Sequence, residues 1–298
     1  MPRIIILMST YNGDDYVEDQ IRSIYEQTFQ DFQLVIRDDG SEPVFLQKLE
    51  KLQRTYGFRL IEGKNAGFAR SFMALLEKAG DAELYAFADQ DDIWLPEKLQ
   101  IAINWFDRHQ REDIPQLFHN AYDIVDSDTL KKTGHFFFSE EGYDFRRSIT
   151  ENHYSGFSMV INQRLRKMML RGRANRIVYH DWWAGMIAHA FGEAYSDPEV
   201  ASLHRAHGDN VTTFSMKTRL QWLKKSLNTD TDIKTRSAEF ARCFAKDMEP
   251  KDLRMLRLFA RKRYSLRRAM KKAFYPKRWR PILSSEVISR FLMLIGRM

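Results

Sequence analysis

Residues 84–96, with the sequence LYAFADQDDIWLP, constrain the fold more than any other part of the chain. The apolar run 84–88 predicts a buried strand, and three carboxylates follow it within four residues. Pro96 then opens a helical pattern, because proline suits the first turn of a helix. Crowded carboxylates repel one another unless a cation joins them, and such hard oxygen ligands suit Mg²⁺ or Mn²⁺. A solvated acidic turn is the alternative for any Asp-x-Asp pair taken alone.

Three earlier apolar runs have the same form, each ending in a polar turn and each followed by a helical pattern. The runs are 4–8, 32–36 and 58–61. Strands that alternate with helices predict the α/β class, with a Rossmann-like, mainly parallel central sheet flanked by helices. The carboxyl ends of such strands share one edge, where ligands bind. The glycines do not match a dinucleotide fingerprint or a phosphate loop. A nucleotide is still the expected ligand, because a cation held by acids commonly carries phosphates.

The chain beyond this unit continues with strands and helices that are less regular. The patterns predict strands at 117–125 and 159–161 and helices at 163–171 and 180–191. Residues 127–150 lack a clear period, and we expect them to form an irregular insertion over the acceptor side.

The net charge of +7 conceals two halves of opposite sign. Residues 1–214 hold 24 Lys and Arg against 33 Asp and Glu, whereas residues 215–298 hold 23 against 7. We therefore expect a catalytic domain over 1–214 and a basic, helical C-terminal extension over 215–298. Near the end, one helical face holds Val287, Ile288, Phe291, Leu292 and Ile295, so an anionic membrane surface is the favoured partner of the basic extension. The alternatives are packing on the catalytic domain and a homodimer contact.

Cysteine content and hydropathy indicate where the protein works. Cys243 is the one cysteine, which fits a reducing compartment. The apolar run near the N-terminus is too short for a signal peptide, and no stretch is long and apolar enough to span a bilayer. We expect a cytoplasmic protein, peripheral at the inner face of the plasma membrane.

A series of motifs connects the chain to a known family. In order they are STYNG at 9–13, RDDGS at 37–41, NxG at 65–67, DQDDxW at 89–94, HDW at 180–182 and HxxN at 207–210. Over about residues 3–214 this series strongly resembles the family-2 inverting glycosyltransferases of GT-A fold, particularly the bacterial rhamnosyltransferase-like members. The resemblance implies an enzyme that builds cell-surface polysaccharide from nucleotide-activated sugars with Mn²⁺ or Mg²⁺.

The same resemblance implies roles for individual residues. Those implied to bind the nucleotide sugar are Thr10, Tyr11, Asn12, Asp38, Asp39, Asn65, Arg70, Asp89 and Gln90. Those implied to hold the metal are Asp91, Asp89 and His207. Asp181 matches the catalytic base, and Trp182 is a candidate for the acceptor site. The favoured donor is dTDP-rhamnose, with UDP-hexoses second, and the acceptor is a lipid-linked or polysaccharide glycan.

Each role has a simpler structural alternative. Asp181 could cap its helix, Trp182 could pack in the core, His207 could lie in a surface loop, and Asp38 with Asp39 could form only a turn. The chain also departs from many relatives, which have Gln rather than Ala206 before the histidine and Asn-x-x-Gly-Cys near 154–158.

Two other function classes remain as alternatives to the enzyme. The basic extension is compatible with a nucleic-acid-binding protein, although the acidic 1–214 region opposes it and no nucleic-acid-binding module is recognised. An inactive sugar-nucleotide-binding scaffold is opposed by the intact carboxylates at 89, 91 and 181.

Overall fold

The structure is a computed structural model that describes residues 1–13, 15–206, 232–261 and 263–298. Its strands are β1 (Ile4–Thr10), β2 (Phe32–Asp38), β3 (Arg59–Glu62), β4 (Leu84–Ala88), β5 (Ile93–Trp94), β6 (Gln116–Asp126), β7 (Lys132–Phe136), β8 (Met159–Asn162) and β9 (Glu193–Ala206). Its helices are α1 (Tyr16–Tyr25), α2 (Pro43–Tyr56), α3 (Phe68–Lys78), α4 (Lys98–His109), α5 (Phe145–Thr150), α6 (Gln163–Met169), α7 (His180–Phe191), α9 (Ile233–Phe244), α10 (Pro250–Leu256), α11 (Leu266–Ala273) and α12 (Leu283–Leu294). Two short 3₁₀ helices span Gly156–Ser158 and Ala174–Arg176.

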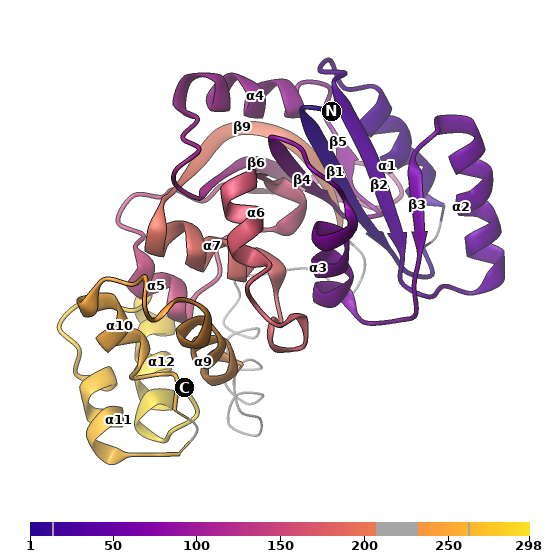
Figure 1. Cartoon of the computed structure of the whole chain (residues 1–298). Coiled ribbons are helices and arrows are strands. Elements are labelled where there is room, and N and C mark those ends of the chain that lie inside the picture. The colour runs from indigo at the N-terminus through magenta and orange to yellow at the C-terminus, as the bar shows by residue number, and fades with distance from the viewer. Residues whose placement is uncertain (14, 207–231, 262) are drawn as a thin grey trace.

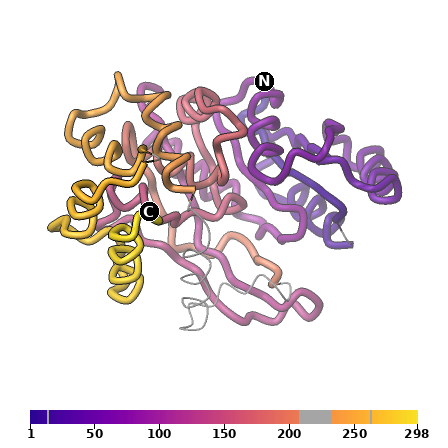
Figure 2. The backbone as a smooth tube through the Cα atoms, turned by 90° about the horizontal axis from the view of Figure 1, so that it is seen from below, coloured from indigo at the N-terminus to yellow at the C-terminus, as the bar shows by residue number. Residues whose placement is uncertain are grey.

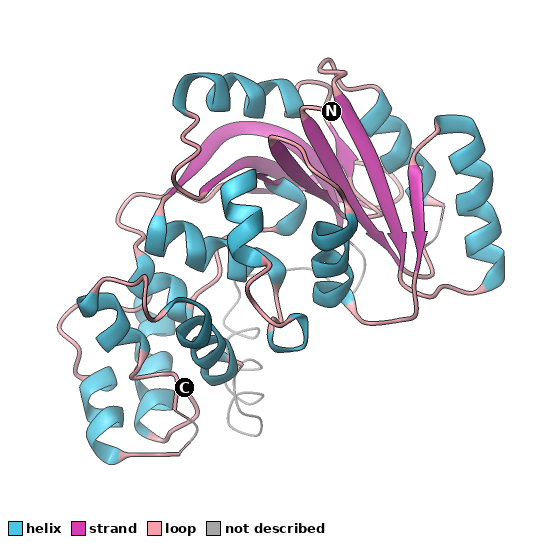
Figure 3. Ribbon diagram, viewed as in Figure 1, coloured by secondary structure: helices cyan, strands magenta, loops and turns pink. Residues whose placement is uncertain are grey.

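The strands of the described residues form one curled sheet with the order β3-β2-β1-β4-β8-β6-β9-β5, and β7 pairs with β6. Strands β3, β2, β1 and β4 are parallel, and β6 and β9 run in the same direction as these four. Strands β8, β7 and β5 run in the opposite direction. Figures 1 and 3 show helices on both faces of the sheet. The predicted α/β class, with a mainly parallel sheet flanked by helices, is confirmed.

The apolar part of β1, Ile4 to Met8, is explained by the burial of both faces of this strand. Successive side chains of a strand point to opposite faces. Ile5 and Leu7 enter a core that extends through α3 and α7, whereas Ile4 and Ile6 enter a second core under α1, α2 and α4. Both faces are covered, so neither set of side chains can be polar.

Residues 127–150 are more ordered than the sequence analysis expected. Asp126 closes a tight turn, because its Oδ1 accepts hydrogen bonds from the backbone N–H of Thr129, at 2.9 Å, and from the Thr129 hydroxyl. The chain then returns as β7 beside β6, and α5 begins at Phe145. Strand β7 reads KTGHF, a sequence with little apolar alternation that fits an edge strand.

Strand β9 is a long element that the sequence analysis did not predict. It pairs in parallel with β6 over its whole length, with a bulge between Asp197 and Val200 that holds Pro198. Proline has no N–H to donate to a neighbouring strand and is confined to sheet edges and bulges. A proline within the segment therefore argued against a strand in the sequence.

Among the C-terminal helices, α9 packs against α5, against the 3₁₀ helix at 174–176 and, through Phe240, against Trp183 of α7, whereas α10 packs against α5. Trp279 is fully buried, and its backbone oxygen accepts a hydrogen bond from the Thr150 hydroxyl at 3.3 Å. Arg173 donates from its guanidinium to both carboxylate oxygens of Glu239. Figures 1 and 2 both place these helices at the opposite end of the molecule from α2. Residues 232–261 and 263–298 therefore pack on the part of the chain that precedes them.

Two further expectations concern the extension. The boundary between residues 214 and 215 lies outside the described residues. Within the described part of the chain, every helix is too short or too polar to cross a bilayer.

Candidate functional site

A cleft opens at the carboxyl ends of β1 and β4, as the parallel topology predicts. It offers about 990 Å³ of open space, enough for a nucleotide sugar. The residues that line it are Ser9, Thr10, Tyr11, Asp39, Asn65, Gly67, Phe68, Asp89, Gln90, Asp91 and His204. Seven of the residues proposed from the sequence thus meet in one place: Thr10, Tyr11, Asp39, Asn65, Asp89, Gln90 and Asp91.

The loops after β1 and β4 are joined by one side chain. Gln90 Oε1 accepts a hydrogen bond from the backbone N–H of Tyr11 at 2.9 Å. The Tyr11 ring is left half exposed over the cleft, whereas Thr10 is buried at the end of β1. A flat, accessible ring at this place is suited to stack on a nucleotide base.

Asn12 and Asp38 build the turn after β2 and are not among the residues that line the cleft. Asn12 adopts a left-handed backbone conformation, with φ of 42°, and its Oδ1 accepts from the backbone N–H of Glu42 at 2.8 Å. Asp38 Oδ2 accepts from the backbone N–H groups of Gly40 and Ser41 at 3.1 and 2.9 Å. The turn role considered for Asp38 is therefore present, and nucleotide contact by these two residues stays a prediction.

Asp39 fixes the neighbouring loop after β3. Its carboxylate accepts from the backbone N–H groups of Ala66 and Gly67 at 2.9 and 2.8 Å, and it pairs with Arg37. The close approach leaves no room at Gly40, where an added Cβ would lie 2.7 Å from the backbone nitrogen of Asn65. Asn65 is thereby held at the cleft wall.

Arg70 lies apart from this wall. It is exposed on α3 and is not among the residues that line the cleft. Its predicted place beside the diphosphate therefore stays a prediction.

The acids after β4 form a cluster with unsatisfied charge. Burial, followed by the charges of Asp92 and Asp91, raises the pKa of Asp89 well above its ordinary value. Asp89 Oδ1 and Asp92 Oδ2 are buried with no hydrogen-bond partner among the described residues. Buried carboxylate oxygens of this kind call for a positive partner. The donor set therefore fits a hard divalent cation held by one or two carboxylates and completed by phosphate oxygens and water.

The protein side chains of the described residues do not complete a metal site by themselves. Among them, no three His, Cys, Asp or Glu side chains converge as a metal-binding group. His207, the third ligand proposed from the sequence, lies outside the described residues. Asp89 and Asp91 remain the carboxylates at the cleft that can face a cation.

His204 is a site residue that the sequence analysis missed. Its Nδ1 lies 2.8 Å from Asp92 Oδ1, and its ring is nearly parallel to that of Phe157, at an interplanar angle of 8°. Burial alone would lower the pKa of His204, but the hydrogen bond to Asp92 and the neighbouring acids outweigh it and raise the pKa. Pairing of Leu203 with Ile93 across β9 and β5 brings His204 to this position. Because this pairing joins segments that are distant in the sequence, no local sequence pattern indicates that His204 belongs to the site.

Asp181 lies in the first turn of α7 and does not cap it. The N-cap position is Tyr179, without a side-chain cap, whereas Asp181 Oδ1 accepts from the backbone N–H of Trp182 at 2.7 Å. Asn152 Nδ2 donates to Asp181 Oδ2 at 2.9 Å. Burial raises the pKa of Asp181 to about 6, although both hydrogen bonds act in the opposite direction. A carboxylate with this pKa is ionised at neutral pH and remains basic enough to accept a proton.

His180 positions Asp181 relative to the sheet. Its ring is fully buried and stacks on Phe72 of α3 at 4.2 Å between centroids, with Phe87 of β4 at 5.0 Å. Burial lowers the pKa of His180 to about 3, so the ring is neutral. After burial and the charges of Asp92 and Asp91, the charge of Asp181 is a smaller contribution to the raised pKa of Asp89. Asp181 itself is not among the residues that line the cleft.

Trp182 has a structural role in this fold. Its Nε1 donates to the backbone oxygen of Ser148 at 2.6 Å, and the guanidinium of Arg236 lies 3.3 Å from its ring centroid. The residue therefore connects α7 with α5 and α9. Acceptor contact by Trp182 stays a prediction.

The chain is similar in sequence and in fold to known proteins. Residues 5–169 match the family model described as glycosyl transferase family 2. The dTDP-rhamnosyl transferase RfbG of Shigella flexneri is 28% identical over 217 residues, which cover 68% of this chain and 72% of that protein. The putative teichuronic acid biosynthesis glycosyltransferase TuaG of Bacillus subtilis is 33% identical over 104 residues, covering 33% of this chain and 40% of that protein.

Two solved structures share this fold. S. aureus TarS 1-349 in complex with UDP-GlcNAc has a TM-score of 0.58 at 16% identity, covering 99% of this chain and 81% of that one. The mannosyltransferase PcManGT from Pyrobaculum calidifontis, in complex with GDP-Man and Mn²⁺, has a TM-score of 0.54 at 16% identity, covering 99% and 87%. At this identity the likeness concerns the fold alone.

Proposed function

Because the chain belongs to glycosyl transferase family 2, we propose that it is an inverting enzyme that transfers a sugar, with rhamnose favoured, from a nucleoside diphosphate. The acceptor is a hydroxyl of a lipid-linked or polysaccharide glycan in bacterial cell-surface synthesis. The match covers residues 5–169, which include the cleft residues from Ser9 to Asp91. The two named relatives support the polysaccharide context, since one is a dTDP-rhamnosyl transferase and the other a putative teichuronic acid glycosyltransferase.

One observation carries the proposal: the acidic loop after β4, with two buried carboxylate oxygens that lack a partner among the described residues, lies at an open cleft, and α7 holds a separate carboxylate, Asp181, whose pKa is raised. Asp89 and Asp91 would hold Mn²⁺ or Mg²⁺, and that ion would stabilise the charge of the departing diphosphate. Asp181 would take the proton from the acceptor hydroxyl. This division of labour matches the needs of inversion, which requires one base for the nucleophile and stabilisation of the leaving group.

The remaining cleft residues would position the donor. The exposed ring of Tyr11 would stack on the base, while Thr10 and Asp39 would approach the ribose and base polar groups. Asn65 would lie beside the nucleotide or the diphosphate. His204 would hold Asp92 in place through its 2.8 Å contact and so support the acidic loop.

The donor assignment rests on the relatives. RfbG is described as a dTDP-rhamnosyl transferase, and TarS was solved with UDP-GlcNAc. We rank dTDP-rhamnose first and a UDP-hexose second for this chain.

The pH dependence of turnover tests the role of Asp181. Because the pKa of Asp181 is about 6, the ionised form required of a base prevails above this pH and is lost below it. Turnover at saturating donor is expected to rise with pH through about 6 and to level off above about 7. The profile should be measured with the full chain in buffers of constant ionic strength. A rate that stays constant down to about pH 5 would contradict this role.

A panel of nucleotide sugars tests the proposed function as a whole. The full chain is incubated with dTDP-rhamnose, UDP-glucose, UDP-GlcNAc or GDP-mannose, with Mn²⁺, Mg²⁺ or a chelator, and released nucleoside diphosphate is measured. We expect release from one donor in preference to the others, and only with a divalent ion. Donor binding without any release, with or without an added glycan acceptor, would instead indicate an inactive binding scaffold.

A further inference from the structure

The C-terminal extension carries exposed apolar side chains on α11, on α12 and in the segments next to them. We define the α11–α12 face by these residues, which are Tyr264, Leu266, Met270, Phe274, Ile282, Leu283, Val287, Phe291 and Ile295. Phe274, Leu266 and Val287 are 69%, 63% and 60% exposed. A set of exposed apolar side chains this concentrated marks an interaction site.

The spacing of these residues shows that the face is a property of both helices. On α11 the exposed apolar positions recur every four residues from 266 to 274, and on α12 they recur every four residues from 283 to 295. Residues four apart lie on one side of a helix. Other positions of the same helices are buried: Ala269 and Ala273 on α11, and Leu292 and Met293 on α12. Each helix thus uses one side for the core and leaves another apolar side outside.

The charge around this face is almost entirely positive. Residues 261–298 contain 12 Lys and Arg and a single acid, Glu286. Glu286 is buried and accepts hydrogen bonds from Arg290 and from the backbone N–H of Trp279. It therefore leaves the outer charge unbalanced. Arg267 and Lys271 are exposed on α11 directly after the apolar positions Leu266 and Met270.

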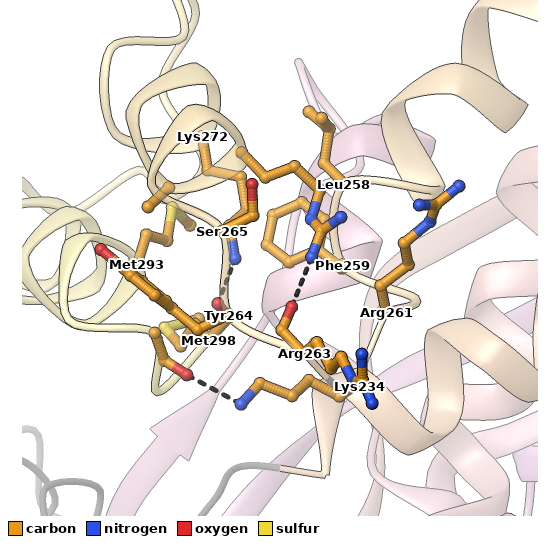
Figure 4. A pocket seen from close by; sticks show the side chains of 13 residues that line it. Lys234, Leu258, Phe259, Arg261, Arg263, Tyr264, Ser265, Lys272, Met293 and Met298 are labelled. Carbon is orange, nitrogen blue, oxygen red and sulfur yellow. Dashed lines mark hydrogen bonds between the residues drawn. The ribbon is translucent and has the colours of Figure 1, made fainter.

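A basic pocket lies at the Tyr264 end of the face (Figure 4). It is lined by Lys234, Arg261, Arg263, Arg268 and Lys272, and no acidic side chain of the described residues lines it. The Lys272 ammonium contacts the backbone oxygen of Met298. Burial, and then the charges of Lys234 and Arg268, lower the pKa of Lys272 to about 8. Cations that repel one another in this way would be stabilised by an anion of phosphate size.

We propose that the α11–α12 face docks on an anionic phospholipid bilayer, with its apolar side chains among the acyl chains and the basic pocket against a lipid phosphate. Basic residues beside an apolar helical face are the pattern of interfacial binding, and each Lys or Arg near an anionic surface adds about 1 kcal/mol. A second copy of the chain is a poorer occupant, because a symmetric contact would bring two positive faces together. Nucleic acid would neutralise the charge and leave the apolar side chains unused.

This inference rests on the proposed function in one respect, since a lipid-linked acceptor would lie on the same bilayer. Its test is independent of sugar transfer. The full chain, without nucleotide sugar, is floated with vesicles of phosphatidylcholine alone or of phosphatidylcholine and phosphatidylglycerol in equal parts. We expect binding to the anionic vesicles that weakens with added salt, and little binding to the neutral ones.

Substitutions in the face are compared with a matched change elsewhere. Phe274→Ser combined with Val287→Ser is expected to weaken vesicle binding by about tenfold or more. Val44→Ser, at an 81% exposed position of α2, is the control and should bind like the parent chain. All three positions are exposed, so thermal unfolding should be unchanged. Equal vesicle binding by the double variant and the control would overturn the proposal.

Charge substitutions test the contribution of the basic residues beside the apolar side chains and in the basic pocket. Arg267→Glu with Lys271→Glu should weaken binding to anionic vesicles more than Lys51→Glu with Arg54→Glu, an equal change of net charge on exposed residues of α2. Arg261→Gln with Arg263→Gln should weaken binding to anionic vesicles and leave binding to neutral ones unchanged. If inorganic phosphate displaced the chain from vesicles no more than chloride at equal ionic strength, the phosphate role of the pocket would be lost.

Three results would contradict the proposal that the α11–α12 face binds a bilayer. A dimer of the parent chain that dissociates in the Phe274→Ser, Val287→Ser variant would make the face a subunit contact. Tighter binding to an oligonucleotide than to anionic vesicles would make it a nucleic-acid surface. Failure to float, together with normal release of nucleoside diphosphate, would overturn this inference and leave the proposed function intact.

Discussion

Asp181→Asn is expected to lower the rate of sugar transfer by about 10²–10⁴-fold, while donor affinity stays close to that of the parent chain. The amide keeps the shape of the side chain and can still accept from the backbone N–H of Trp182, but it cannot take a proton. Donor binding should survive because Asp181 is not among the residues that line the cleft. Initial rates at saturating donor and calorimetric titration with the nucleoside diphosphate measure the two effects separately.

Loss of folding is not expected to account for this loss of rate. Burial raises the pKa of Asp181 to about 6 in the folded protein, above its ordinary value. The folded protein therefore binds more protons than the unfolded chain between these two values, and stability falls as the pH rises through them. At neutral pH a neutral amide removes this cost, although one hydrogen bond from Asn152 is lost. The midpoint of thermal unfolding should stay close to that of the parent chain.

A matched substitution separates the role of this carboxylate from a general loss of charge. Asp113→Asn changes an exposed carboxylate that pairs with Arg111, and its activity should equal that of the parent chain. An Asp181→Asn enzyme with near-normal turnover would refute the assignment of the base.

Asp91→Asn should weaken donor binding and also lower turnover, by about 10²–10³-fold for loss of one group that stabilises the leaving charge. Burial raises the pKa of Asp89, and the charges of Asp92 and Asp91 raise it further. Removing one charge should relieve Asp89 and weaken the site for Mn²⁺ at the same time. Calorimetric titration of Mn²⁺ in the presence of nucleoside diphosphate gives a readout that does not depend on turnover.

Asp91→Asn and Asp181→Asn are expected to respond differently to added Mn²⁺. Raised Mn²⁺ concentration should partly restore the Asp91→Asn enzyme and should not restore Asp181→Asn. Unchanged affinity for Mn²⁺ in Asp91→Asn would show that this carboxylate is not a ligand. Asp113→Asn again provides the control for altered net charge.

The first half of the fold could be predicted because its strands are buried on both faces. A continuous apolar run such as residues 4–8 has few other structures available, and the polar turns that follow mark where each strand ends. Strands β7 and β9 gave no such signal. They are polar, and in β9 Pro198 occupies a bulge that only the pairing with β6 explains. Their stability comes from neighbours that are distant in sequence.

In the candidate site, too, local motifs could be predicted from the sequence and contacts between distant segments could not. The acids of the β4 loop and the residues after β1 are local motifs, and the structure brings them to one cleft. His204 reaches Asp92 through strand pairing, and Asn152 reaches Asp181 across a gap of 29 residues, so neither contact has a local pattern. The indole of Trp182 is held by Ser148 and Arg236, two partners that no spacing rule identifies.

The attachment of the C-terminal helices at Thr150 decides how far the two halves of the chain are separable. Arg280 donates to the backbone oxygen of Thr150 at 2.5 Å, and Thr150 lies two residues before Asn152, the partner of Asp181. Deletion of residues 260–298 would uncover this anchor and disturb the base as well as the outer face. Hybrids that graft the tail of one relative onto the sheet of another would therefore have to exchange the 145–152 segment along with it.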